Sequence, residues 1–207
     1  MRIILASKSP RRKELLSSVC AAFEIITSEA DETLPKDMHP RDGVEMLSCR
    51  KGAAVRSLLK SRGEAWEDAL IISSDTLVEK DGVPLGKPED EADAFRMLKA
   101  LSGARHNVHT GVAVHYGDRV VSGVATTGVY FREMTDGEIL DYIKTGEPMD
   151  KAGAYGIQGL GGGFVEKTEG DYDTVVGLSM RLTEELVKDV CGKNLSELSR
   201  EVENDKR

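Results

Sequence analysis

A run of hydroxyl and basic side chains, Ser7-Lys8-Ser9-Pro10-Arg11-Arg12, directly follows the apolar residues 3–6. Ser9 is a typical helix N-cap, and Pro10 suits the first helical position because that position needs no N–H donor. The unpaired N–H groups at a helix start attract anions. Positive side chains are unfavourable beside the positive end of the helix dipole, so helix stability does not explain the two arginines at this position. The run therefore predicts a phosphate pocket. The alternative is an ordinary capped helix with a solvated basic face.

A carboxylate and a lysine form the second candidate set. Asp75 follows Leu70-Ile71-Ile72-Ser73-Ser74, which predicts that it lies just past the C-terminal end of a buried strand, where open α/β sheets bind ligands. Lys51 stands four residues after Leu47 and three before Ala54, on the inward stripe of a predicted helix. A lysine there extends to solvent or meets an anion, and the spacing favours the anion. Taken alone, Asp75 more often just begins a turn.

Two more charged residues are candidates with less support from the sequence. Lys87 lies beside a fixed turn in Leu85-Gly86-Lys87-Pro88, and Glu32 lies in a polar loop after a predicted strand. Taken singly, the first is typical of a surface residue and the second of a solvated loop. The four histidines show no metal-ligand spacing tied to a carboxylate, so we expect them to be structural or at the surface.

A glycine-rich segment, residues 153–163, contains six glycines and one amide side chain, Gln158. A dinucleotide fingerprint needs a strand before it and a helix after it, whereas Phe164 and Val165 predict a strand after this segment. That function is therefore excluded, and what remains is a loop whose backbone can approach a flat ligand closely. An amide offers a donor and an acceptor side by side, which match the N–H and adjacent carbonyl of uracil or thymine. A loop-bracing role for Gln158 is the alternative.

The elements that must hold these residues alternate between strands and helices, which predicts an α/β fold with a mixed sheet. Thr135 and Glu138 have the spacing of a capping box. We expect one continuous domain over residues 1–192, with two lobes as an option. The charged tail 193–207 is expected to be disordered or to extend the last helix. Predicted strands are 3–6, 23–27, 70–73, 109–116 and 120–131, and predicted helices are 10–18, 41–62, 92–101, 135–145 and 177–190.

Composition narrows the classes of partner. The 207 residues include 28 Lys and Arg against 36 Asp and Glu, a net charge of −8. This charge argues against binding to nucleic acid polymers, because such binding is dominated by phosphate neutralisation. No apolar run reaches the length of a signal peptide core or a membrane span, so we expect a cytoplasmic protein without membrane contact. Three widely spaced cysteines indicate reduced thiols and no structural disulfide.

Together these motifs, in this order, resemble the Maf family of nucleotide pyrophosphatases over residues 2 to about 190. The resemblance implies an α/β fold like that of the inosine triphosphate pyrophosphatases, with an elongated mixed β-sheet, flanking helices and a central cleft, in a homodimer. The motifs are 5–12, Ser74-Asp75-Thr76, Leu85-Gly86-Lys87-Pro88, Thr110-Gly111-Val112, 146–159, Gly170-Asp171-Tyr172 and Val175-Val176-Gly177-Leu178.

The resemblance also implies an activity: hydrolysis of a nucleoside triphosphate to the monophosphate and diphosphate, with a divalent cation, Mg²⁺ or Mn²⁺. By position, Asp75 matches the family's catalytic acid or base, and we expect it to hold the cation together with Glu32. The family's other active-site residues correspond to Lys51, Lys87 and Glu32. Its phosphate-side motif corresponds to Ser7, Arg11 and Arg12.

Three positions separate branches of the family, and here they are Arg11, Thr76 and Gln158. This combination resembles the dTTP/UTP branch and differs from the 7-methyl-GTP branch. Two departures from the family pattern, Asp173-Thr174 and Ser179, are expected to flank the pocket wall and to affect fine specificity. Alternative functions are a nucleotide-binding regulator of cell division without hydrolysis, a pyrophosphatase for ITP or XTP, and an interaction module without catalysis.

Overall fold

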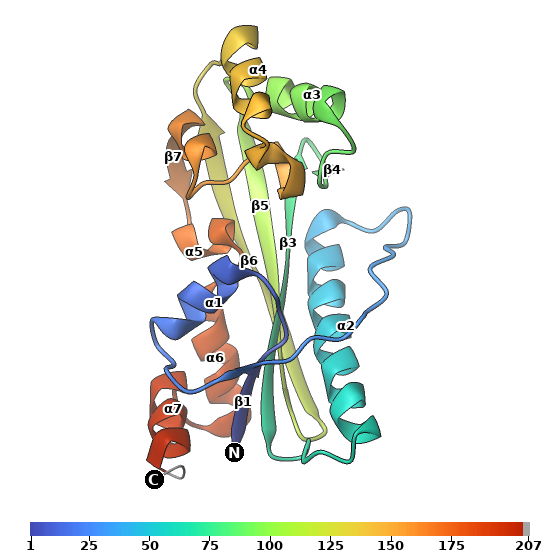
Figure 1. Cartoon of the computed structure of the whole chain (residues 1–207), viewed down its shortest axis with the longest axis vertical. Helices are drawn as coiled ribbons and strands as arrows, with labels where there is room; N and C mark the ends of the chain where they lie inside the picture. The colour runs from blue at the N-terminus through green and yellow to red at the C-terminus, as the bar shows by residue number, and fades with distance from the viewer. Residues whose placement is uncertain (205–207) are drawn as a thin grey trace. The chain divides into compact units, whose positions relative to one another are not determined.

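The computed structural model describes residues 1–204 and contains a seven-stranded sheet with helices packed against it (Figure 1). The strand order is β2-β1-β3-β5-β6-β7, with β4 paired to β3. β1 is parallel to β2 and β3, whereas the β3–β4 and β6–β7 pairs are antiparallel. The predicted α/β class with a mixed sheet and flanking helices is confirmed.

The helices and strands have the following bounds. The strands are β1 (Arg2–Leu5), β2 (Glu24–Ile25), β3 (Ala69–Lys80), β4 (Val83–Leu85), β5 (Arg105–Tyr116), β6 (Arg119–Phe131) and β7 (Val165–Glu169). The α-helices are α1 (Pro10–Ser17), α2 (Pro40–Ser61), α3 (Glu91–Leu101), α4 (Asp136–Lys144), α5 (Tyr172–Val176), α6 (Met180–Cys191) and α7 (Leu195–Asn204). Three short 3-10 helices are η1 (Glu147–Asp150), η2 (Ala152–Ala154) and η3 (Leu160–Phe164).

The chain divides into two compact units. The first contains Met1–Asp75, Thr110–Ala125 and the described residues from Gly177 onward, and the second contains Thr76–His109 and Thr126–Val176. The long strands β3, β5 and β6 each contribute residues to both units. Asp75 is the last residue of its segment in the first unit, so the predicted site residues are distributed over both.

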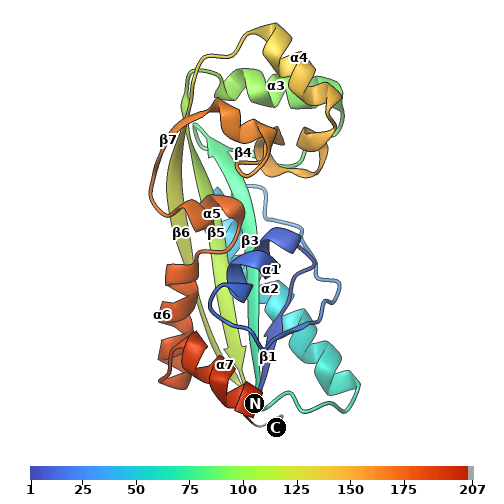
Figure 2. The same cartoon turned by 60° about the vertical axis from the view of Figure 1, so that its left-hand side comes forward.

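In the first unit, apolar side chains of the strands pack against helices on both faces of the sheet. Ile3 and Leu5 pack with side chains of α6 and α7, while Ile4 packs with Val55 and Leu59 of α2. Figures 1 and 2 show α2 on one face of these strands and α1, α6 and α7 on the other. Since both faces are covered, the strands are continuously apolar rather than alternating, as is typical of buried parallel strands.

β3 is longer than the sequence predicts, and this corrects the placement of Asp75. The strand was expected to end at residue 73, but it continues to Lys80, so Asp75 lies within it and not past its end. The reason is the hairpin with β4, in which Val78 pairs with Leu85. The turn is made by Asp81 and Gly82, both with positive φ. Because residues 78–80 pair with β4, the strand continues past its continuously buried residues 69–74.

The predicted helix 177–190 begins later than expected. Gly177 has φ +124 and separates α5 from α6, and α6 starts at Met180 with Ser179 as N-cap, whose Oγ accepts the Leu182 N–H. After a left-handed Gly192, the segment that we expected to be disordered or to extend α6 forms a separate helix, α7. The last residues of the predicted tail, 205–207, lie outside the described residues.

The second unit packs its own core. Leu98 of α3, Ile139 of α4 and Val129 of β6 belong to one buried cluster, and α3 contacts α4 directly. The predicted capping box at Thr135 and Glu138 is present at the start of α4. The aromatic rings of Phe131, Tyr142, Tyr155 and Phe164 meet at tilted or T-shaped angles in this cluster.

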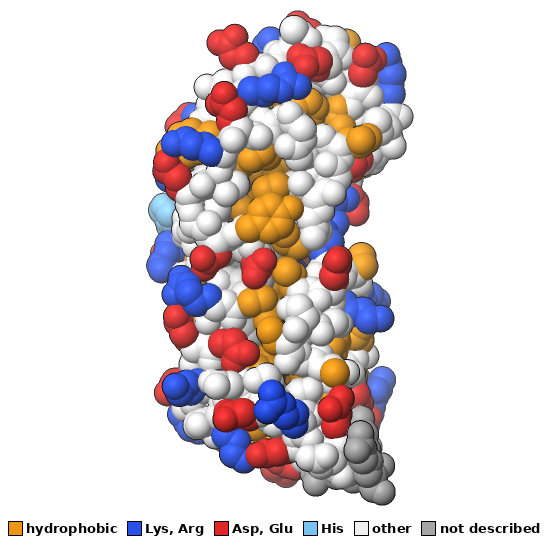
Figure 3. All heavy atoms as spheres, turned by 90° about the vertical axis from the view of Figure 1, so that its left-hand side faces the viewer, with side chains coloured by type: hydrophobic (Ala, Val, Ile, Leu, Met, Phe, Trp, Pro, Cys, Tyr) orange, Lys and Arg blue, Asp and Glu red, His pale blue; other side chains and the backbone are white. Residues whose placement is uncertain are grey.

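Two surface properties bear on partners. On the face shown in Figure 3, lysine and arginine side chains are interspersed with aspartate and glutamate, and its described residues form no extended basic block. Within residues 1–204, no helix combines the length and the apolar character needed to cross a membrane. Cys20, Cys49 and Cys191 are all free thiols, as the sequence predicts.

Candidate active site

Lys51 joins two carboxylates in the first unit. Its Nζ lies 2.5 Å from Asp75 Oδ1 and 3.1 Å from Glu32 Oε1. The Lys51 and Asp75 side chains are 19% and 13% exposed, whereas Glu32 is 64% exposed. The structure thus brings together three predicted site residues from α2, β3 and the loop after β2. Two are held in a partly buried pair, and the third is open to solvent.

The local packing of α2 determines where Lys51 points. Gly52, the next residue, is so close to the sheet that a Cβ there would lie 2.3 Å from His115 Nε2 and 2.8 Å from Ser73 Oγ. Ser73 Oγ also donates to the Ser48 carbonyl one turn earlier. Because the helix backbone contacts the sheet here, Lys51 is held against β3 and reaches Asp75.

Arg12 is anchored beside this cluster by a backbone carbonyl. Its Nε donates to the Gly177 oxygen at 2.8 Å, and Ser74 Oγ donates to the same oxygen at 2.8 Å. Arg12 Nη1 also donates to Ser7 Oγ at 3.3 Å. The positive φ of Gly177 allows this carbonyl position, which an L-residue would adopt only with strain. The structure therefore joins Ser7 and Arg12 from the predicted phosphate motif.

The charge on Arg12 is balanced by the nearby carboxylates. Burial lowers the pKa of the Arg12 guanidinium, the charge of Asp75 raises it, and neighbouring Arg11 lowers it further. Glu32 also raises it. Arginine pKa values start so high that the side chain stays positive at neutral pH. The first unit thus holds the positive charges of Arg12 and Lys51 near two carboxylates, with Arg11 next to Arg12 in the chain.

The other predicted site residues belong to the second unit. Thr76 follows Asp75 within β3. Lys87 is exposed two residues after the end of β4, and the carbonyl of the intervening Gly86 accepts the Gly153 N–H at 3.0 Å. This bond connects the Lys87 turn to the start of the glycine-rich segment. Gln158 is exposed on that segment. The sequence alone gave no reason to expect contact between the two loops.

The residues present fit a divalent cation through their chemistry. Asp75 and Glu32 supply carboxylate oxygens that converge on one positive charge, the Lys51 ammonium. Mg²⁺ is bound typically by one or two carboxylates, with waters and substrate phosphates completing its ligands. Among the described residues, no group of three or more His, Cys, Asp or Glu side chains is arranged to hold a metal ion. A cation held here would therefore take part of its ligands from substrate and water.

The sequence did not point to Glu147 or Tyr142, which organise the glycine-rich segment. Glu147 accepts hydrogen bonds from Tyr142 Oη, from Leu160 N and from Gly161 N at 2.8, 3.0 and 3.1 Å. The partners lie 13 and 14 residues apart along the chain. No helix or strand periodicity links such positions, so only the quoted family motif around Gly146-Glu147-Pro148 marked the region.

A buried histidine–carboxylate pair was also missed. His109 Nε2 lies 2.9 Å from Glu79 Oε2, and His109 Nδ1 contacts Thr126 Oγ1 at 2.9 Å. The Gly82 N–H donates to the other Glu79 oxygen. Burial acts to raise the pKa of Glu79, but the hydrogen bonds from His109 and the Gly82 N–H together hold it below its usual value. The pair joins β3, β5 and β6 in the second unit and gives His109 a structural role.

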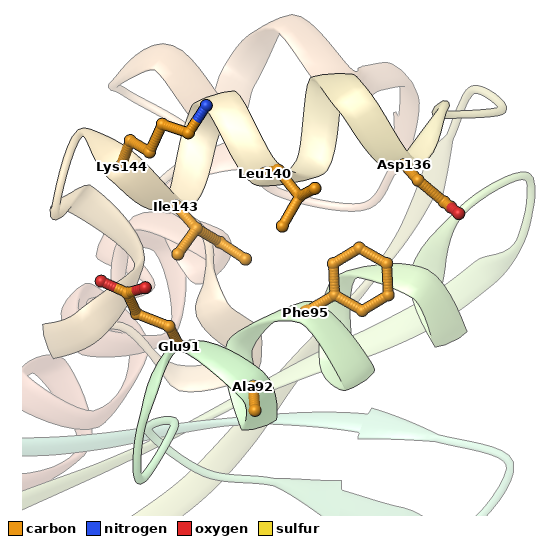
Figure 4. A pocket seen from close by; sticks show the side chains of 7 residues that line it. All are labelled: Glu91, Ala92, Phe95, Asp136, Leu140, Ile143 and Lys144. Carbon is orange, nitrogen blue, oxygen red and sulfur yellow. The ribbon is translucent and has the colours of Figure 1, made fainter.

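The second unit contains an open pocket between α3 and α4. Figure 4 shows Phe95 of α3 facing Leu140 and Ile143 of α4. Glu91 and Lys144 lie at its margin (Figure 4). None of the predicted site residues lines this pocket, so it is not the candidate active site.

Comparison with known proteins places these observations in a family. A dTTP/UTP pyrophosphatase of Bdellovibrio bacteriovorus is 46% identical over 188 residues, covering 89% of this chain and 96% of the relative. A dTTP/UTP pyrophosphatase of Clostridium beijerinckii is 44% identical over 192 residues, covering 92% of this chain and 100% of the relative. Among solved structures, the Staphylococcus aureus Ham1 protein aligns with 99% of this chain and 100% of its own at 14% identity, with a TM-score of 0.49. The family described as Maf-like protein matches residues 2–190, and the chain therefore belongs to the Maf family.

Proposed function

We propose that this protein hydrolyses dTTP and UTP to the nucleoside monophosphate and diphosphate. The observation that carries the proposal is the Lys51 ammonium between Asp75 and Glu32, next to the anchored Arg12. The names of relatives at 44 and 46% identity support the substrate class. A regulator that binds a nucleotide without hydrolysis, or a purine pyrophosphatase, has no comparable support.

The reaction needs a water molecule, a base and stabilisation of the leaving group. The water oxygen bonds to a phosphorus of the α–β bridge as the bridging P–O bond breaks, and the leaving phosphate group takes the electron pair. We assign to Asp75 the role of accepting the proton of this water. Positioning and electrostatic stabilisation supply most of the rate in phosphoryl transfer. We assign to Lys51 and Arg12 the balancing of charge that develops on the phosphates.

We assign the remaining roles on chemistry and on the family resemblance. Ser7 belongs to the phosphate side, and Lys87 supplies another positive charge for phosphates. Arg11, Thr76 and Gln158 are assigned to the base. A Mg²⁺ or Mn²⁺ ion held by Asp75 and Glu32 would supply Lewis-acid stabilisation of phosphate charge. A homodimer in the cytoplasm completes the proposal, and light scattering of the purified protein tests the dimer.

The decisive experiment compares Asp75→Asn with the wild type in a diphosphate-release assay with UTP. The substitution keeps the size of the side chain but removes the base, so we expect kcat to fall by about 10²–10⁴-fold. Asp81→Asn is the matched control, because Asp81 lies in the exposed β3–β4 turn with positive φ, which asparagine tolerates well. Near-native UTP hydrolysis by Asp75→Asn contradicts the proposal.

A substrate panel tests the specificity in the same assay. It contains dTTP, UTP, CTP, modified pyrimidine triphosphates, ITP and 7-methyl-GTP. We expect dTTP and UTP to give the highest kcat/KM, because the names of the relatives indicate these substrates and the Gln158 amide can pair with the N–H and adjacent carbonyl of uracil or thymine. Preference for ITP identifies the purine alternative instead. Activity that survives removal of divalent cations with a chelator contradicts the metal requirement.

A further inference from the structure

A hydrogen-bonded pair, Glu147 and Tyr142, holds both ends of the loop that carries Gln158. Glu147 Oε2 accepts the Leu160 N–H, and Glu147 Oε1 accepts the Gly161 N–H and the Tyr142 hydroxyl. The Tyr142 oxygen in turn accepts the Gly156 N–H at 3.3 Å. Three backbone amides of the loop, one before Gln158 and two after it, therefore end on a single tyrosine–glutamate pair.

The glycines of this loop leave room for the carboxylate. A Cβ at Gly159 would lie 2.4 Å from Glu147 Oε1, and a Cβ at Gly161 would lie 2.6 Å from Tyr142 Oη. Both distances are below any normal contact. Glycine at these two positions lets the backbone wrap around the Glu147–Tyr142 pair. This close approach explains two of the glycines in the glycine-rich segment.

The protonation states of the pair suit this role. Burial acts to raise the pKa of Glu147, but bonds from the Gly161 and Leu160 amides and from Tyr142 hold it below its usual value. Burial, and then the bond to Glu147, raise the pKa of Tyr142. At neutral pH the carboxylate is therefore charged and accepts every bond, and the phenol keeps the proton that it donates. Tyr142 is 5% exposed and fixed in the core of the second unit.

Gln158 lies between the fixed points and does not brace the loop itself. It is exposed, and within residues 1–204 its amide has no hydrogen-bond partner. The backbone beneath it is closed by a turn in which Gly159 N–H donates to the Gly156 carbonyl at 3.1 Å. The bracing role that was the alternative for Gln158 is thus performed by Glu147, and the amide remains available for a ligand.

We propose that Glu147 is a positioning residue for base recognition, which holds the loop 156–161 so that the Gln158 amide is preorganised for a uracil or thymine ring. The proposal rests on the proposed function. A loop that is ordered before binding loses less conformational entropy on binding, so its anchor contributes to affinity for the matching base. Glu147 itself touches neither base nor phosphate.

The test is Glu147→Gln, which replaces two acceptor oxygens by one and turns an N–H donor toward a backbone N–H. We expect KM for UTP and dTTP to rise about tenfold and the preference for UTP over CTP to shrink about tenfold, with kcat within about threefold of the wild type. The matched control is Glu169→Gln. Glu169 also accepts a tyrosine hydroxyl, from Tyr130 at 2.8 Å, but it is exposed on β7. We expect the control to retain the wild-type KM and base preference.

Two further measurements keep the proposal falsifiable. Tyr142→Phe removes only the shared hydroxyl and, because it fills the same core space, tests the anchor if Glu147→Gln does not fold; we expect the same changes, about three- to tenfold. Amide hydrogen exchange at Leu160 and Gly161 is expected to accelerate at least about tenfold in Glu147→Gln, while β6 amides stay protected.

The outcomes separate this inference from the proposed function. A wild type that hydrolyses neither UTP nor dTTP contradicts the proposed function and the inference together. An active wild type whose Glu147→Gln variant keeps KM, base preference and slow exchange at Leu160 overturns the inference alone. Loss of kcat with unchanged KM and preference also overturns it, because that pattern indicates a role in the chemical step.

Discussion

At the scale of single residues, Lys51 is the side chain on which the candidate chemistry depends. One ammonium is shared by Asp75 and Glu32, and removing a shared partner leaves a partly buried carboxylate without its counter-charge. Such a loss costs more than the pair itself contributes, because the remaining charge has already given up water. We therefore expect Lys51 to link the stability of the first unit to its activity.

The variant Lys51→Met tests this link. We expect kcat/KM for UTP to fall by about 10²-fold or more, since phosphate charge loses a fixed partner, and the free energy of unfolding to fall by about 1–3 kcal/mol. Lys60→Met is the control on the same helix, where Nζ lies 3.5 Å from the centre of the Trp66 ring. It removes a comparable contact outside the candidate site and is expected to leave kcat/KM unchanged. Equal activity of the two variants would refute the role of Lys51.

Single residues also show what spacing along the chain can and cannot predict. The inward position of Lys51 followed from helical periodicity, because neighbours on one helix face are fixed by local geometry. Glu147 was missed because its partners are brought to it by irregular backbone, which has no period. The His109–Glu79 pair was missed because strand register between distant segments determines it.

At the scale of elements, the contact between α2 and the sheet determines the position of Lys51. Gly52 has no side chain, so the helix backbone lies directly against His115 and Ser73. Alanine favours a helix by about 1 kcal/mol over glycine, so helix propensity alone predicts that Gly52→Ala is stabilising. The structure predicts the opposite, because the added methyl would overlap a buried ring.

We expect Gly52→Ala to lower the free energy of unfolding by about 1–3 kcal/mol, as overpacking of a core does, and to lower kcat by displacing Lys51. Gly43→Ala on the same helix is the matched control. A Cβ at Gly43 meets only the flexible end of Leu34, 2.9 Å away, so that variant is expected to be neutral or stabilised by up to about 1 kcal/mol. Chemical denaturation of both variants measures the difference. A stabilised Gly52→Ala would show that α2 can move from the sheet without cost.

Elements were predicted well where local signals determine them and less well at their ends. The helix at residues 135–145 was confirmed because its capping box is a local signal. The end of β3 was wrong, because pairing with β4 extends it beyond its apolar run. The start of α6 was wrong, because the positive φ of Gly177 interrupts a continuous apolar pattern. Both errors have a tertiary cause that no local pattern contains.

At the scale of the whole molecule, buried histidines couple folding to pH. Burial lowers the pKa of His106 to about 4, with the charges of Lys80 and Arg105 acting in the same direction. Burial and the nearby Arg56 lower the pKa of His115 to about 4 as well. In the unfolded chain a histidine has a pKa of about 6.5. Between these two values the unfolded state binds protons that the folded state does not.

These pKa values determine the direction in which stability changes with pH. Stability rises with pH wherever the unfolded state binds more protons, so the contribution of each histidine is complete above pH 6.5 and is lost as the pH falls toward 4. Each one contributes a slope of up to about 1.4 kcal/mol per pH unit in this window. We therefore expect the free energy of unfolding, measured by urea denaturation at constant ionic strength, to decrease steeply from pH 6.5 to pH 4.5. Carboxylates such as Glu79, whose pKa is also lowered, add to the decrease at the acid end.

The variant His115→Leu isolates one histidine. Because leucine does not titrate, the slope between pH 6.5 and 4.5 is expected to become shallower by up to about 1.4 kcal/mol per pH unit, whatever the variant's stability at neutral pH. Val114→Ala, at the neighbouring buried position of β5, is the control: it removes packing but no proton site, so its curve is expected to lie below that of the wild type by a constant amount. Parallel curves for His115→Leu and the wild type would mean that His115 accepts its proton equally in both states, and the buried ring would then have to be reached by solvent in the folded protein.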